Sequence, residues 1–165
     1  LHLLSRRQRQ MCIRDRYYLC IVKGKLNKPQ KVSAYLRKDE KTNKVTVSKQ
    51  EIFGGNHIET AYEPVISNDE FTLLKVKLIT GKTHQIRAHL ASIGHPLIGD
   101  FKYGDRKINQ QMKQRFGLKD QLLHCQEIVF PKHMKTCSNL SGKRIQAPLP
   151  KRFETIKQEL FGRDL

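Results

Sequence analysis

The sequence has no tryptophan, few acidic residues and no long apolar run. A membrane-spanning helix needs roughly 20 consecutive apolar residues, and no stretch of this 165-residue chain approaches that, so a spanning segment is excluded. The first residues also lack the basic start, apolar stretch and cleavage site of a signal peptide. We therefore expect one soluble, cytoplasmic, monomeric domain that does not act at a membrane.

Paired cysteines are absent as well. The four cysteines are Cys12, Cys20, Cys125 and Cys137, and none forms a C-x-x-C pair. A zinc ribbon or a redox motif is therefore not indicated. On a helix, His84 and His89 would point about 140° apart, and no H-E-x-x-H arrangement is present. We expect reduced thiols and no metal site, with the histidines making structural hydrogen bonds or contacts to a binding partner.

Positive charge dominates the composition. Lys and Arg number 32 against 15 Asp and Glu, which gives a net charge of +17. Such an excess causes self-repulsion unless a polyanion relieves it. Nucleic-acid phosphate is the first expectation for a partner, an anionic membrane surface is the second, and a basic surface without a partner is the remaining alternative.

The N-terminal half reads as two strand pairs. Aromatic and β-branched residues predict a buried strand at 17–22, and two basic segments at 31–40 and 43–48 predict a hairpin. This hairpin is either a solvated sheet edge or a contact for the RNA backbone. In the second case we expect three of its residues to bind RNA: Lys31, Arg37 and Lys38.

The remaining pattern mixes strands and helices. The segments 57–67 and 71–80 predict a second strand pair, and 83–93 changes to helical spacing with Gly94 at its end. A short helix at 108–116, a strand at 122–131 and a helix after Pro150 follow. The order predicts an α+β fold with a mixed, largely antiparallel sheet and flanking helices.

The first sixteen residues do not continue this pattern. They show no strand or helix period that connects to the strand at 17–22, and RQMCIRDR is similar to a translated sequencing adapter. We interpret 1–16 as a non-native or disordered tail and 17–165 as the folded domain.

The most informative stretch is 78–104, LITGKTHQIRAHLASIGHPLIGDFKYG. It resembles the signature of the RluA family of pseudouridine synthases, which is written L-x-T-G-R-T-H-Q-I-R-x-H, G-H-P-I-x-G-D and Y-G. This sequence has Lys82 at the position where the family usually has Arg. The strand from Tyr18 to Gly24 is similar to the family's Y-x-A-x-V-x-G, and 123–130 is similar to its L-H-A…F strand. The resemblance covers about 17–162, and it implies the family's catalytic-domain fold, incomplete at the N-terminus.

The resemblance also implies an activity. The family isomerises uridine in RNA to pseudouridine without a cofactor or metal, using an Asp, and this sequence's Arg87 and Tyr18 correspond to catalytic residues. Structured RNA is the implied partner, with large-subunit ribosomal RNA first and transfer RNA second. A half-buried Arg needs an anionic partner, and the resemblance implies that Arg87 pairs with the catalytic Asp.

The helix start after Gly81 is the second expected RNA contact. A helix N-terminus offers positive potential and N–H donors to phosphate. Including the loop that follows the helix, the expected RNA-binding residues here are Lys82, Thr83, His84, Gln85 and Lys102.

The family's H-R-L-D-x-x-T-S-G segment, which holds the Asp, has no match here. Asp15 is not assigned to that role, and Asp100 is interpreted as a structural or capping residue. We therefore expect an inactive fragment whose Arg87 has no partner and whose pocket is loose. The alternative is a non-catalytic RNA-binding protein that uses the same fold.

Overall fold

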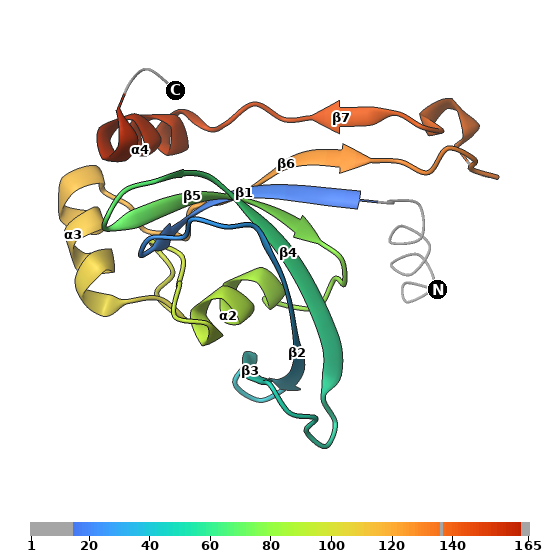
Figure 1. Cartoon of the computed structure of the whole chain (residues 1–165), viewed down its shortest axis with the longest axis horizontal. Coiled ribbons are helices and arrows are strands. Elements are labelled where there is room, and N and C mark those ends of the chain that lie inside the picture. Colours follow the sequence, from blue (N-terminus) through green and yellow to red (C-terminus); the bar gives the residue numbers. More distant parts are fainter. Residues whose placement is uncertain (1–14, 136, 163–165) are drawn as a thin grey trace.

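The computed structural model describes residues 15–135 and 137–162. Among them, seven strands form one antiparallel sheet in the order β3-β2-β4-β5-β1-β6-β7 (Figure 1). The strands are β1 Asp15–Lys23, β2 Gln30–Asp39, β3 Lys44–Ser48, β4 Asn56–Ser67, β5 Phe71–Leu78, β6 Leu123–Val129 and β7 Arg144–Gln146. The α+β expectation is confirmed, and every pairing between described strands is antiparallel rather than mixed.

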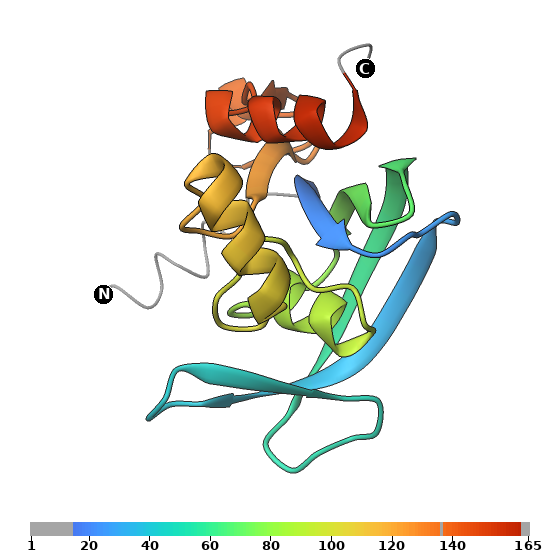
Figure 2. The same ribbon diagram turned by 90° about the vertical axis from the view of Figure 1, so that its left-hand side faces the viewer.

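Three helices among the described residues flank the sheet (Figures 1 and 2). They are α2 Gln85–Ser92, α3 Arg106–Phe116 and α4 Lys151–Phe161, and a 3-10 turn, η1, spans Ser138–Leu140. None of the described helices combines the length and apolar character that crossing a bilayer requires.

The inner strand β1, which lies between β5 and β6, is buried on both faces, and this explains its continuous apolar run. Cys20 and Val22 pack with Ile86 and Leu90 of α2 on one face. Leu19 and Ile21, which alternate with them, pack with residues of α3 and α4 on the other. The sheet therefore separates two apolar layers, and we call the side that carries α2 the α2 face.

Three element boundaries differ from the sequence expectation. β1 begins at Asp15, so Asp15 and Arg16 belong to the sheet and not to a tail; residues 1–14 lie outside the described part of the chain. α2 begins at Gln85, because His84 has a left-handed backbone with φ 54°. α3 begins at Arg106, because the Asp105 carboxylate accepts hydrogen bonds from the N–H groups of its first turn.

The short strand β7 and the η1 turn were not predicted. Both consist of three residues, and all three side chains of β7 are exposed. An edge strand this short carries no apolar alternation, so the sequence holds no signal for it.

Candidate functional site

Tyr18 of β1 and Arg87 of α2 line one pocket of about 270 Å³ on the α2 face. Lys82 and His84, which precede the helix, form another part of its wall. Because α2 packs on the inner strand β1, two residues far apart in the sequence meet here. The two residues to which the family resemblance assigns a catalytic role thus share one pocket, and Lys82 lines it too. Thr83 is exposed next to the pocket.

Arg87 is held by Asp100. Its Nε donates to Oδ2 of Asp100 at 2.7 Å and its Nη2 donates to Oδ1 at 2.8 Å. Oδ1 also accepts the backbone N–H groups of Lys102 and Tyr103 at 2.9 and 3.0 Å. The expectation that Arg87 lacks a partner is therefore wrong, because the loop after α2 supplies a carboxylate. The structural interpretation of Asp100 is confirmed.

Each residue of the Arg87–Asp100 pair stabilises the charged form of the other. Burial acts to raise the pKa of Asp100, but hydrogen bonds from Arg87 and from the backbone N–H groups of Tyr103 and Lys102 outweigh it and lower that pKa. The hydrogen bond to Asp100 in turn raises the pKa of Arg87. Asp100 is 1% exposed at its side chain. It is thus a fixed counter-ion and does not face the pocket as a free carboxylate.

Tyr103 connects the pair to the hairpin β2–β3. Its hydroxyl accepts the backbone N–H of Val45 at 3.0 Å and lies 3.0 Å from Nδ1 of His84. The guanidinium carbon of Arg87 lies 5.3 Å from the centre of the Tyr103 ring, a cation–π distance. Sequence reasoning identified Tyr103 only as part of the Y-G motif and missed this positioning role.

Tyr18 is a half-buried phenol. Burial raises its pKa, and neighbouring Cys125 raises it further, whereas Arg16 lowers it. Cys125 is the partner of Tyr18 in the β1–β6 register. Arg16 lies on the same side of β1, with its guanidinium so close to Gly81 that a side chain at Gly81 would collide with it. The phenol therefore stays neutral at ordinary pH and can donate a hydrogen bond.

Gln85, one of the expected RNA contacts, lines the Tyr18–Arg87 pocket, but its side chain is engaged in hydrogen bonds within the protein. Its side chain is 2% exposed. Its Nε2 donates to the Glu59 carbonyl at 2.9 Å and to Thr60 Oγ1 at 3.1 Å. Its Oε1 accepts the N–H of Lys82 at 3.0 Å and the hydroxyl of Thr80 at 2.9 Å. Gln85 thus anchors Thr80 and Lys82, which precede α2, to strand β4. It also accepts the backbone N–H of Lys82, which is then not free to bind a phosphate.

The expected contacts on the hairpin divide between the two faces of the sheet. Lys38 lies on the α2 face, in the same alternation as buried Ala34 and Leu36, and it acts electrostatically on His84. Lys31 and Arg37 alternate with them and lie on the opposite face. These two therefore do not belong to the Tyr18–Arg87 pocket.

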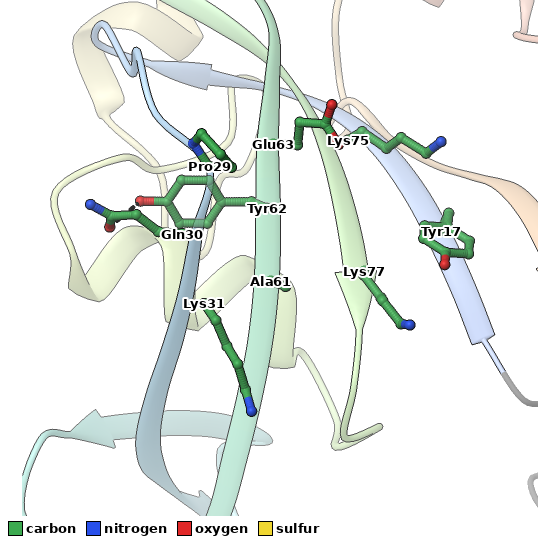
Figure 3. Close-up of a pocket in the computed structure, with 9 residues that line it drawn as sticks. All are labelled: Tyr17, Pro29, Gln30, Lys31, Ala61, Tyr62, Glu63, Lys75 and Lys77. Carbon is green, nitrogen blue, oxygen red and sulfur yellow. Dashed lines mark hydrogen bonds between the residues drawn. The ribbon is translucent and has the colours of Figure 1, made fainter.

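Lys31 borders a separate hollow of about 400 Å³ on that opposite face, shown in Figure 3. Its Nζ is 2.8 Å from a carboxylate oxygen of Glu59. The Tyr17 ring lies across the hollow, with Nζ of Lys75 at 5.1 Å and Nζ of Lys77 at 5.7 Å from its centre. Three lysines and one carboxylate, Glu63, line the hollow, and two of the lysines, Lys31 and Lys77, form ion pairs with Glu59 and Asp15.

The histidines make structural hydrogen bonds, as expected. His89 is buried and its Nδ1 lies 3.0 Å from Thr60 Oγ1, while Nδ1 of His95 lies 2.9 Å from the carbonyl of Lys23. Within residues 15–135 and 137–162, no group of three His, Cys, Asp or Glu side chains could hold a metal ion.

Comparison with known sequences identifies relatives. The family model described as RNA pseudouridylate synthase matches residues 4–92. The ribosomal large subunit pseudouridine synthase C of Pasteurella multocida is 38% identical over 143 residues, covering 84% of this chain and 41% of that protein. The protein of the same name from Haemophilus influenzae is 36% identical over 147 residues, covering 87% and 43%. The chain thus spans about two fifths of the length of these relatives.

Solved structures show the same fold. Human RNA pseudouridylate synthase domain containing 4 superposes with a TM-score of 0.70 at 18% identity, covering 96% of this chain and 66% of that one. Human RNA pseudouridylate synthase domain containing 1 gives a TM-score of 0.64 at 18% identity, covering 89% and 58%. Together with the sequence matches and the motif at 78–104, this shows that the chain belongs to the RNA pseudouridylate synthase family, in its RluA group.

Proposed function

We propose that this chain forms the uridine-binding part of an enzyme that converts uridine to pseudouridine in large-subunit ribosomal RNA. The observation that carries the proposal is the meeting of Tyr18, Arg87 and Lys82 in one pocket of a family member. The names of the bacterial relatives support ribosomal RNA as the substrate. The net charge of +17 supports a polyanionic partner.

The reaction explains why these residue types belong in the pocket. Isomerisation breaks the bond between N1 of uracil and C1′ of the ribose, turns the base, and joins C5 to C1′ with loss of the C5 proton. The base must first leave its stack and enter a pocket. The Tyr18 ring supplies an aromatic wall and its neutral phenol a donor, while Arg87 and Lys82 supply positive charge beside the flipped nucleotide.

The described residues supply no free carboxylate to the pocket. None of the side chains that line it is a carboxylate, and Asp100 is committed to Arg87. The reaction class uses a carboxylate as nucleophile. We therefore infer that the chain by itself binds its RNA without turning it over.

Tritium release from ribosomal RNA labelled at C5 of uridine tests this proposal. The chain alone should release none. A chimera with the N-terminal portion of the Pasteurella multocida relative should release tritium. In this chimera, Tyr18→Phe should slow the release. Tyr17→Phe is the matched control, because Tyr17 is the neighbouring residue on the opposite face.

Turnover by the chain alone would contradict the inference about the carboxylate. RNA binding by the chimera without turnover on ribosomal or transfer RNA would favour the non-catalytic alternative.

A further inference from the structure

A second hollow of about 420 Å³ adjoins the Tyr18–Arg87 pocket. We call it the cationic hollow, because five basic side chains line it: Lys44, Arg87, Lys102, Arg106 and Lys119. It shares Arg87 and Gln121 with the pocket, so these two side chains form a common wall. A polymer strand that places one unit in the pocket can therefore place the next unit in the hollow.

The positive charge of the hollow is largely uncompensated. Asp100 neutralises Arg87, but the other four basic side chains form no ion pair with any carboxylate in the described part of the chain. Asp120 is the single acidic residue among those that line it. Like charges brought together repel one another, and a bound anion removes this cost.

The backbone shapes the hollow around this charge. Gly99 and Gly104 line it without side chains. Gly99 has φ 78°, and a side chain there would collide with the carbonyl of Asp120, so the 99–104 loop packs directly on the 118–121 segment. Nζ of Lys102 donates to the carbonyl of Asn43, which joins the β2–β3 turn to this loop. Three separate segments thus converge on one charged site.

An aromatic side chain completes the hollow. Phe101 lines it and is 57% exposed, although exposure of a ring to water is unfavourable. Basic side chains beside an open aromatic ring are the combination that binds single-stranded RNA, with phosphate on the cations and a base stacked on the ring.

We propose that the cationic hollow binds the nucleotide next to the target uridine, with its phosphodiester among Lys44, Arg106 and Lys119 and its base against Phe101. This rests on the proposed function, because it takes the Tyr18–Arg87 pocket as the seat of the uridine. The ligand class is a single-stranded RNA backbone that leaves the pocket past Arg87 and Gln121.

Fluorescence anisotropy of the chain with a labelled single-stranded RNA containing one uridine tests the proposal. The triple variant Lys44→Gln, Arg106→Gln, Lys119→Gln should bind more weakly. The plot of log binding constant against log salt should become shallower by about 0.7 for each phosphate that the variant no longer neutralises. Phe101→Leu should weaken binding by about fivefold or more. The matched control is Lys28→Gln, Lys132→Gln, Lys151→Gln, which removes the same charge from exposed positions outside the hollow.

A single uncharged methylphosphonate linkage placed on either side of the uridine locates the contact. At one of these two positions it should weaken binding to the wild-type chain and leave binding to the triple variant unchanged. Equal losses in the hollow variant and the control variant would overturn the inference while leaving the proposed function intact. The proposed function fails separately if RNA binding stays unchanged when the uridine of the RNA is replaced, or when Tyr18→Ala is introduced into the chain.

Discussion

Arg87 and Asp100, which are 13 residues apart in the sequence, form a bidentate ion pair that joins helix α2 to the loop preceding α3. Two parallel N–H···O bonds fix the plane of the guanidinium as well as its charge. Arg87 therefore lines the pocket with its guanidinium held in a fixed orientation.

Removing the carboxylate should destabilise the domain. In Asp100→Asn, Arg87 keeps its charge without a buried counter-ion, and the free energy of unfolding should fall by about 3 kcal/mol. Asp69→Asn is the control, because its ion pair with Lys25 is exposed and should contribute far less. Urea unfolding measures both variants. A similar loss in the two would mean that the buried pair has no special stabilising role.

Acid should weaken the fold through His89. Burial lowers the pKa of His89 below its ordinary value, so between that lowered pKa and about 6.5 the unfolded state binds more protons than the folded state. The free energy of unfolding should therefore fall as the pH drops from 7 to 5, by at most about 1.4 kcal/mol per pH unit from this group. His89→Gln should flatten the slope. Parallel slopes in the variant and the wild type would show that His89 does not titrate in unfolding.

The hydroxyl of Tyr103 should contribute to stability independently of its ring. Tyr103→Phe keeps the ring beside Arg87 but removes the hydrogen bonds to Val45 and His84, and the expected cost is about 1 to 2 kcal/mol. Tyr35→Phe is the matched control, since the Tyr35 hydroxyl makes no hydrogen bond with the described residues. Thermal or urea unfolding compares the two variants, which should differ clearly.

Gly99 should tolerate no side chain. Gly99→Ala combines a positive φ with a collision against Asp120, and we expect a loss of about 3 kcal/mol in the free energy of unfolding. Gly54 has a similar φ of 71° with nothing within 4 Å of an added Cβ, so Gly54→Ala should lose only about 1 kcal/mol, from the backbone alone. The difference measures the packing of the 99–104 loop. Equal losses would contradict the close approach at Gly99.

The sequence by itself determined the family, the α+β class and most strands and helices. Alternating or continuous apolar runs set which side chains of β1 and β5 must be buried, and this information is local. The motif at 78–104 identified Arg87 and the strand at 18–24 identified Tyr18, both through the family resemblance, and the structure places these two residues in one pocket. Helix α4 was predicted in the same way, from its apolar stripe.

Only the tertiary structure decided which partner each polar side chain has. The pairing of Arg87 with Asp100, the burial of Gln85 against β4 and the position of Lys31 on the far face depend on how distant segments pack. A side chain's hydrogen-bonding groups can be satisfied by any neighbour that the fold brings within reach, and sequence spacing does not specify that neighbour. For the same reason the cationic hollow, whose lysines and arginines come from four separate segments, exists only once the chain has folded.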